Sequence, residues 1–178
     1  MKKAVPSDDQ DKDVAGLPYR PCVGAALFNP DGLVWVGKRI SRPGDNGVNA
    51  WQMPQGGIDK GEAPEDALFR ELKEETGIDA AEIIAETAGW LTYELPIHLR
   101  RISWRGKYRG QKQKWFGLRF LGKDRDFDLG AYGKPEFSSW RWVPLEELPD
   151  LIIPFKRDVY TQLVAEFGHL PEGVKTKI

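Results

Sequence analysis

The segment from residue 51 to residue 77 constrains the fold most, because a glycine-rich stretch runs directly into a short helix with marked ends. Pro64 stands in the first turn of this helix and Gly77 just beyond its last turn, the usual positions for these residues. The inward stripe is expected to comprise Leu68, Phe69, Leu72 and Thr76. Residues 51–64, with glycine at 56, 57 and 61, are expected to be irregular and able to approach a ligand closely.

Three glutamates crowd this helix within the stretch RELKEETGI. At roughly 100° per residue, Glu71 and Glu75 fall nearly in line and Glu74 lies one step round, so all three are expected to point into one region. Like charges one turn apart weaken a helix by about 0.2–0.5 kcal/mol per pair, and nothing in the run is expected to neutralise them. One interpretation is a solvated helix face. The other is a set of oxygen ligands for Mg²⁺, which would remove the repulsion.

The rest of the chain predicts strands and one further helix around this segment. Apolar and alternating patterns predict strands at 21–28, 33–40, 81–95 (one or two) and 113–122, and a strand entering a helical turn at 138–150. The turn at 29–32 makes the first two strands a hairpin, and 41–49 is expected to be a surface loop. The second helix, 154–168, carries Phe155, Val159, Leu163 and Phe167 at fourfold spacing. This order indicates an α+β fold, an α/β/α sandwich with a mixed sheet between helices.

The length of 178 residues and net charge of −1 fit one globular domain. Residues 1–16 and 173–178 are expected to be tails, leaving a domain at 17–172. Because the net charge is near zero, contact with nucleic acid requires a local basic patch. The single cysteine, Cys22, is expected to be buried. No run approaches the roughly 18 apolar residues of a membrane helix and no signal-peptide pattern begins the chain, so a cytoplasmic protein without a membrane partner is expected.

The spacing of the glycines and charged residues resembles the Nudix box. The chain has Gly56, five residues, Glu62, seven residues, Arg70-Glu71-Leu72, one residue, Glu74-Glu75, one residue and Gly77-Ile78. The wider chain is similar to the bacterial RNA pyrophosphohydrolase and dinucleoside polyphosphate hydrolase branch of the Nudix superfamily, in YRPCVGAALFN, WQMPQGGI, GQKQKWF, PEFSSWRWV and FKRDVY. It departs in the longer loop 41–50 and in Ala50, where those members have serine.

The resemblance implies a hydrolase of phosphoanhydride bonds that depends on Mg²⁺, with Mn²⁺ as a possible substitute. It implies that the metal is held by Glu71, Glu74 and Glu75 with Gly56 and Glu136. Bound cations would neutralise phosphate oxygens and activate water. Arg70 is expected to pair with Glu62 and orient the loop against the helix. The general base implied is Glu136, with a glutamate of the box as the alternative.

A basic segment with interleaved aromatic residues points to the substrate. Residues 99–114 hold seven Arg or Lys and no acid, together with Trp104 and Tyr108, a pattern that suits a phosphate chain carrying a base. A solvated basic loop is the alternative. By resemblance, the phosphate-binding residues are Arg20, Arg39, Gln111, Lys112, Lys114 and Lys156. Tyr93 and Phe155 would contact bases, whereas His98 and His169 are expected at the surface.

Two hypotheses of different class follow. The first is an enzyme that removes pyrophosphate from the 5′-triphosphate end of RNA, initiating mRNA decay, or in a close variant hydrolyses diadenosine tetraphosphate. The second is a non-catalytic nucleotide- or RNA-binding module on the same fold. The intact glutamate set favours the enzyme, because a pure binder has no reason to keep mutually repelling ligands. The sequence indicates no stable protein partner.

Overall fold

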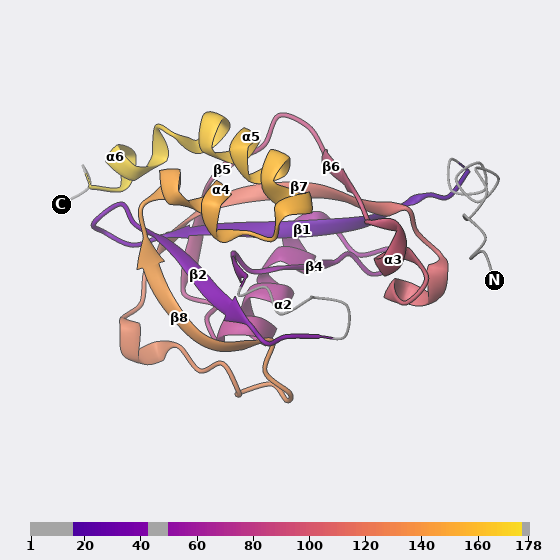
Figure 1. Ribbon diagram of the computed structural model, residues 1–178. Coiled ribbons are helices and arrows are strands. Elements are labelled where there is room, and N and C mark those ends of the chain that lie inside the picture. The colour runs from indigo at the N-terminus through magenta and orange to yellow at the C-terminus, as the bar shows by residue number, and fades with distance from the viewer. Residues whose placement is uncertain (1–15, 43–49, 176–178) are drawn as a thin grey trace, which may run out of the picture.

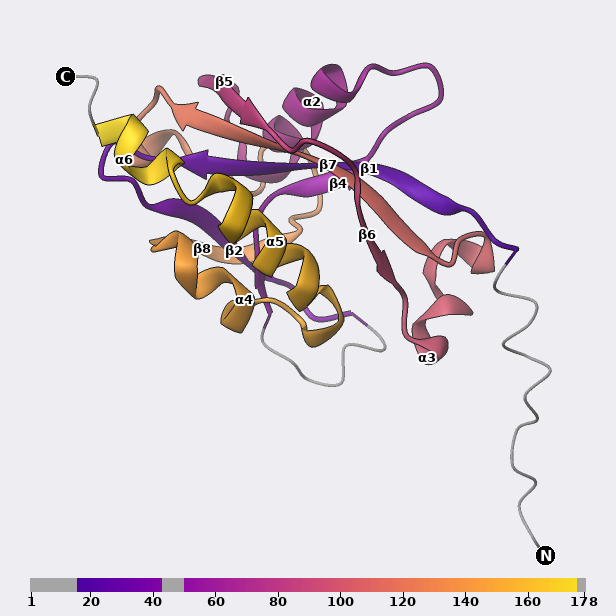
Figure 2. The ribbon, with the colours of Figure 1, turned by 90° about the horizontal axis from the view of Figure 1, so that it is seen from above.

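The computed structural model describes residues 16–42 and 50–175. Residues 43–49 of the predicted loop, and residues 1–15 and 176–178 of the predicted tails, lie outside the described residues. The fold is an α+β sandwich in which a mixed sheet of eight strands lies between helices, as the sequence predicted. Figure 2 shows α2 on one side of the sheet and α4, α5 and α6 on the other.

Two parallel strands form the centre of the sheet (Figure 1). β1 (Tyr19–Phe28) pairs along its whole length with β7 (Gly110–Phe120). The other edge of β7 carries β5 (Ala81–Glu86) and then β6 (Leu91–Glu94), both antiparallel to it. The expected strand at 113–122 therefore begins three residues earlier, because Gly110, Gln111 and Lys112 also pair with β1.

The sheet divides on the other side of β1. β2 (Val34–Arg39) pairs with β1 at Phe28 and Val34, so the predicted hairpin is confirmed at its base. Beyond that point β2 pairs with β3 (Trp51–Gln52) and β8 (Phe137–Val143). β4 (Gln55–Gly57) lies beside the earlier part of β1. The expectation that 51–64 would be wholly irregular was wrong, because the edge of β1 that β2 leaves open binds β4 through backbone hydrogen bonds.

Helix α2 (Pro64–Thr76) has the predicted ends. Gly77 follows it with φ 78°, a left-handed conformation that glycine adopts without steric cost, and its N–H donates to the carbonyl of Lys73. Ala67, Leu68, Leu72 and Thr76 are buried, whereas Phe69 is only half-buried. The stripe packs on the odd-numbered face of β1, where Val23, Ala25 and Leu27 are buried. This packing holds the glutamate-bearing turns at a defined height above the sheet.

The opposite face of the sheet is covered by the C-terminal helices. These are α4 (Leu148–Leu151), α5 (Arg157–Phe167) and α6 (Leu170–Lys175), with 3-10 turns at Leu145–Glu147 and Pro154–Lys156. Val159, Leu163 and Phe167 are buried, as predicted from their spacing. Val174 is also buried in this core, so the C-terminal tail does not begin at residue 173 as expected.

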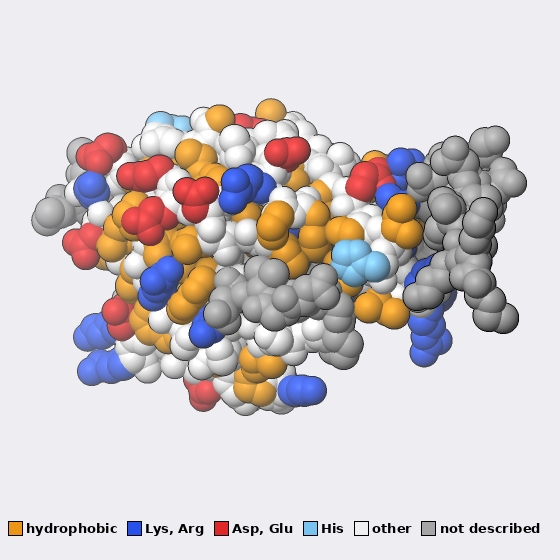
Figure 3. All heavy atoms as spheres, in the orientation of Figure 1, with side chains coloured by type: hydrophobic (Ala, Val, Ile, Leu, Met, Phe, Trp, Pro, Cys, Tyr) orange, Lys and Arg blue, Asp and Glu red, His pale blue; other side chains and the backbone are white. Residues whose placement is uncertain are grey.

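The remaining elements form an excursion at one end of the molecule and a turn at the other. α3 (Ile97–Arg100) and a 3-10 turn at Ser103–Gly106 lie between β6 and β7, and a further 3-10 turn spans Asp124–Asp126. Figure 3 shows acidic side chains gathered over the C-terminal helices, and Lys and Arg side chains at the end that carries α3. Cys22 is buried, and His98 and His169 are exposed, as expected. Among the described residues, no helix has the length and apolarity needed to cross a bilayer.

Candidate active site

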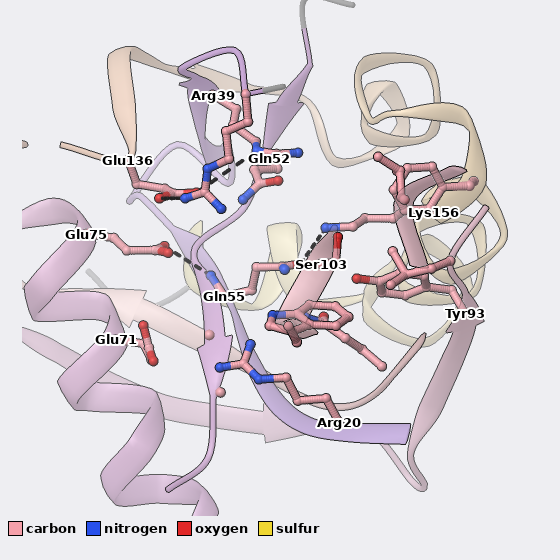
Figure 4. Close-up of a pocket in the computed structure, with 18 of the residues that line it drawn as sticks. Arg20, Arg39, Gln52, Gln55, Glu71, Glu75, Tyr93, Ser103, Glu136 and Lys156 are labelled. Atoms are coloured by element: carbon pink, nitrogen blue, oxygen red, sulfur yellow. Dashed lines mark hydrogen bonds and ion pairs between the residues drawn. The ribbon is translucent and has the colours of Figure 1, made fainter. Parts of the chain in front are cut away.

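A cavity of about 620 Å³ lies where the sheet divides. Its walls come from β1, β2, β3, β4, β7 and the second half of α2, and it is closed by the α3 excursion and by the turn before α5 (Figure 4). Most of the sequence-predicted residues line it: Arg20, Arg39, Gly56, Glu71, Glu75, Tyr93, Gln111, Glu136, Phe155 and Lys156. Residues far apart in sequence thus meet because β1, β4 and β7 are hydrogen-bonded neighbours.

Glu71 lies directly against the backbone of Gly56. A Cβ atom at residue 56 would fall 1.9 Å from Glu71 Cδ, so no larger residue fits while this carboxylate keeps its position. Burial raises the pKa of Glu71, although Arg70 donates a 2.9 Å hydrogen bond to it and opposes that rise. The glycine therefore serves close approach rather than an unusual backbone angle.

Glu75 is the most deeply placed carboxylate of the site. The backbone N–H of Gln55 donates to its Oε2 at 3.1 Å. Burial raises the pKa of Glu75 well above its usual range, and the negative charges of Glu71 and Glu136 raise it further. A buried carboxylate without a paired cation is costly, by several kcal/mol when ionised. The facing oxygens of Glu71, Glu75 and Glu136 thus form an environment that a divalent cation would stabilise, and the residues present fit such an ion.

Glu74 does not share this cavity, contrary to the expectation that all three glutamates point into one region. Its side chain is half exposed and lies 3.5 Å from Arg70. The expected lack of neutralisation was also wrong, because Arg70 contacts Glu71 and Glu74 at once. Among residues 16–42 and 50–175, no three carboxylate, imidazole or thiol groups form a ready-made metal cage. Glu74 would have to turn inward to act as a ligand.

Arg70 joins the loop to the helix as predicted. It donates to Glu62 through Nε at 2.8 Å and through Nη2 at 2.9 Å, and Nη2 also reaches the carbonyl of Gly57 at 2.8 Å. This contact lowers the pKa of Glu62 to about 2. Glu62 also accepts the N–H of Asp59 at 2.8 Å, so one carboxylate ties the loop backbone to the arginine of the helix.

Glu136, which directly precedes β8, lies near Glu75 of α2 and is paired with arginine (Figure 4). Arg42 contacts its carboxylate directly, and Arg39 lies 4.0 Å from it. Its side chain is 26% exposed, compared with 57% for that of Arg42. Because Arg42 is largely in solvent, it can leave this carboxylate at little cost.

Two cations, Arg20 and Lys156, line the cavity across from Glu71 and Glu75 (Figure 4). Arg20 lies 5.3 Å from the ring centroid of Trp104, and a Cβ atom at Gly57 would fall 2.3 Å from its guanidinium. Lys156 is buried, which lowers its pKa to about 8, with a further contribution from the positive charge of Arg39. Carboxylates on one wall and cations on the other suit a metal-bound phosphate chain.

An aromatic pair lies beside the cations. The rings of Tyr93 and Phe155 have centroids 5.6 Å apart and are inclined at 44°, and Lys156 Nζ lies 5.2 Å from the Tyr93 ring. Burial raises the pKa of Tyr93 far above its usual range. The structure thus brings both predicted base contacts to one side of the cavity.

The basic segment 99–114 is not a single loop, and two of its lysines do not reach the cavity. Gln111 points into it, so Lys112, its neighbour on β7, points to the opposite face. There Lys112 Nζ lies 5.4 Å from the Trp90 ring. Lys114 contacts the carbonyl of Thr87 and lies 3.6 Å from Glu86. Placing these two lysines on the phosphate chain was therefore wrong, because strand alternation separates them from Gln111.

Several lining residues were missed or not assigned a role from the sequence. Trp104 and Arg105 have φ values of 48° and 56°, the only positive values among described residues other than glycine. This backbone turns Trp104 toward Arg20, and Tyr108 packs on its edge at 6.1 Å. In the sequence, the aromatic residues of the basic segment were the feature that could have indicated this arrangement. The other lining residues are Arg42, Gln52, Gln55, Gly57, Leu95, Leu99, Ile102 and Ser103, which no motif marks apart from the glycine-rich stretch.

The layered fold and this site define a class: a hydrolase that acts on a phosphate chain with the help of divalent metal. The family model described as NUDIX domain matches residues 18–163, so the chain belongs to the Nudix family. It is 50% identical to an RNA pyrophosphohydrolase of Brucella abortus over 165 residues, covering 89% of this chain and 92% of the relative. It is 51% identical to the RNA pyrophosphohydrolase of Mesorhizobium japonicum, covering 86% and 92%. The resemblance to this branch is thus confirmed.

Solved structures share the fold. The E. coli dihydroneopterin triphosphate pyrophosphohydrolase has a TM-score of 0.63 at 21% identity, covering 84% of this chain and 99% of that chain. A C. elegans Ap4A hydrolase complex has a TM-score of 0.58 at 19% identity, covering 84% and 98%. At such identities the likeness establishes the architecture alone.

Proposed function

We propose that this protein is an RNA 5′ pyrophosphohydrolase that removes pyrophosphate from the 5′-triphosphate end of RNA. The observation that carries the proposal is one cavity in which the buried Glu71 and Glu75 face Arg20 and Lys156. About half of the residues are identical to those of curated RNA pyrophosphohydrolases along nearly the whole chain, which supports RNA as the substrate. We place the reaction in the cytoplasm, where new transcripts carry triphosphate ends.

The metal proposed is Mg²⁺, with Mn²⁺ as a substitute. Glu71 and Glu75 would hold it with the carbonyl of Gly56 and with Glu136, and Glu74 would join by turning from Arg70. The ion would neutralise phosphate oxygens and activate water for attack. The side chain of Arg70 would keep the loop carrying Gly56 in place through Glu62.

The residues of this chain would then position the substrate and move one proton. Arg20, Lys156 and Gln111 would hold the phosphate chain against the glutamates, which supplies the in-line geometry on which phosphoryl transfer depends. The water oxygen bonds to phosphorus as the anhydride bond breaks and pyrophosphate leaves with the bond electrons. Glu136 would accept the proton of that water after releasing Arg42, and a glutamate of the box is the alternative base.

Recognition of the RNA bases would depend on Tyr93 and Phe155, while Arg39 would help to hold the phosphates. An aromatic pair next to a buried ammonium group can contact a base while the phosphates remain on the cations. Diadenosine tetraphosphate offers the same two features, so its hydrolysis is the second candidate. A non-catalytic binding role is disfavoured, because a protein without metal chemistry would leave the buried Glu75 carboxylate without a counter-ion.

A side-by-side rate comparison tests the function. Purified protein with Mg²⁺ is given triphosphorylated RNA, diadenosine tetraphosphate and free nucleoside triphosphates, and kcat/KM is measured for each. We expect RNA to give the highest value. A higher value for diadenosine tetraphosphate would transfer the assignment to dinucleoside polyphosphates, and no turnover of any of them would leave only the binding role.

A further inference from the structure

Three glutamine side chains form a hydrogen-bonded group beneath the cavity, which we name the amide ladder: Gln55, Gln111 and Gln113. Gln113 Nε2 donates to Gln111 Oε1 at 2.8 Å and to Gln55 Oε1 at 3.1 Å. Gln113 and Gln111 are 1% and 3% exposed, so water cannot replace these bonds. The ladder also reaches the glutamate wall, because the backbone N–H of Gln55 donates to Glu75.

The direction of the ladder is set at one end by Trp115. The indole Nε1 lies 3.0 Å from Gln113 Oε1. An indole N–H can only donate, so the Gln113 atom that faces it must be the carbonyl oxygen. The Gln113 amide nitrogen must then face the other two glutamines, and their carbonyl oxygens must turn toward it. The arrangement therefore follows from the chemistry of tryptophan and not from the choice between two similar amide atoms.

Lys156 sets the same direction at the other end. Its ammonium group, which can donate hydrogen bonds but cannot accept them, lies 3.5 Å from Gln55 Oε1. Two donor-only groups thus point the amide oxygens of the ladder inward. The Nε2 groups of Gln55 and Gln111 have no hydrogen-bond partner among the described residues, and both side chains line the cavity. The floor of the cavity accordingly offers N–H donors, which is what phosphate oxygens require.

We propose that Trp115 and Gln113 are positioning residues that orient Gln55 and Gln111 to donate hydrogen bonds to the substrate's phosphate chain. Neither positioning residue touches the substrate, since Trp115 is fully buried and Gln113 nearly so. In the reversed arrangement the two amide oxygens would face the phosphates, and like partial charges would oppose binding. This inference rests on the proposed function only in taking a phosphate chain as the ligand.

The test removes the single indole N–H group that sets the direction of the ladder. Trp115→Phe keeps an aromatic ring against Tyr160, which the indole meets edge-on at 5.8 Å, but has no N–H. Binding of inorganic triphosphate is measured in EDTA, and steady-state kinetics with the best phosphate-chain substrate in Mg²⁺. We expect Kd and KM to rise roughly three- to tenfold, the size of one or two partly lost hydrogen bonds. We expect kcat to change less than twofold.

A double-mutant cycle separates orientation from packing. Gln113→Leu breaks the ladder, so adding Trp115→Phe to it should cause no further loss of triphosphate affinity. Unchanged binding by Trp115→Phe alone would overturn the proposal. So would an equal loss from Trp115→Phe in both backgrounds, because the indole would then act through packing.

A measurement on the unmodified protein covers the case in which a variant does not fold. In ¹H–¹⁵N spectra, inorganic triphosphate should shift the side-chain amide signals of Gln55 and Gln111 more than that of Gln113. The proposal is overturned if neither of the first two moves. Because the probe contains no RNA, failure of triphosphorylated RNA as a substrate would refute the proposed function and leave this result standing.

Discussion

Burial shifts the pKa values of individual charged groups in the site away from their ordinary range. Glu75 and Lys156 lie on opposite walls of one cavity, and burial opposes ionisation of both. Such groups reduce stability when they stand alone and become favourable when a counter-ion arrives. Burial of these two charges lowers the stability of the unbound protein. Binding of a cation and a phosphate chain between them offsets that cost.

Substitution of Glu75 by glutamine should separate activity from stability. Glu75→Gln keeps the size of the side chain and removes the charge that Glu71 and Glu136 repel. We expect turnover to fall by several orders of magnitude, with Tm unchanged or raised. Activity assays with Mg²⁺ and thermal unfolding of the same samples check this. Glu65→Gln, on the exposed first turn of α2, is the matched control and should retain activity. Substantial turnover by Glu75→Gln would refute the metal assignment.

Lys156 should make both binding and stability depend on pH. Its pKa is about 8 in the folded protein and 10.5 in its ordinary state, so between these values the unfolded chain binds more protons. The contribution of Lys156 to stability therefore rises as pH increases through this window. We expect Lys156→Met to raise Tm at pH 7 and the difference to shrink toward pH 10.5. A Tm difference that does not change with pH would contradict the assigned burial of charge.

Deprotonation of Lys156 should also weaken phosphate binding. As the free protein loses the proton of Lys156 above about pH 8, its affinity for inorganic triphosphate should fall. The Lys156→Met variant should bind weakly throughout and lose this pH dependence. Titration calorimetry from pH 7 to pH 10 compares the two, and parallel curves would assign the dependence to another group.

At the scale of elements, the short strand β4 and the helix α2 form one unit. Arg70 and Glu62 tie the connecting loop to the helix, and glycine at 56 and 57 lets Glu71 and Arg20 lie against the backbone of β4. The glycine-rich segment thus combines regular pairing on β1 with a surface bare enough for two charged groups. A side chain on either glycine would push one of these charges out of the cavity.

A methyl group at residue 56 should therefore disable the site without unfolding the protein. Gly56→Ala places a Cβ atom 1.9 Å from Glu71 Cδ, so the carboxylate must move. A displacement of about 1 Å can cost roughly a hundredfold in rate. We expect kcat/KM to fall at least that far, with a small decrease in Tm. The control is Gly89→Ala, where a Cβ atom meets nothing within 4 Å. Full activity of Gly56→Ala would show that this position of Glu71 is not the working one.

At the scale of the molecule, the two faces of β7 have different roles. The even face of β1 and the Gln111 side of β7 face the cavity, whereas Lys112 and Trp90 lie on the other face. A short dinucleotide would fill the cavity alone. A longer RNA would extend beyond it, and the Lys and Arg side chains gathered at the α3 end (Figure 3) would attract its backbone.

Charge reversal at Lys112 should distinguish the two substrates. Lys112→Glu is expected to raise KM for triphosphorylated RNA severalfold and to reduce its salt dependence, while diadenosine tetraphosphate is hydrolysed nearly as before. Arg125→Glu, on the distant 3-10 turn Asp124–Asp126, changes the net charge equally and is the control. Equal losses on both substrates would mean that Lys112 acts on the cavity and would remove its role in RNA preference.

Local chemistry accounts for what the sequence by itself determined. The ends of α2 at Pro64 and Gly77, the buried faces of α2 and α5, and the pairing of Arg70 with Glu62 all depend on residues within about fifteen positions of one another. Helical periodicity and terminal residues are visible over such distances. The Nudix box with its glutamates could be recognised in the sequence for the same reason.

Only the tertiary structure decided which of those residues face one another. That β4 would occupy the edge of β1, that Glu74 would turn to Arg70, and that Lys112 would point away from Gln111 depend on strand register. The orientation of the amide ladder depends on Trp115 and Lys156, which are 41 residues apart in the sequence and meet the same glutamines. Register and long-range pairing arise from the packing of the whole sheet, and no local pattern in the chain encodes them.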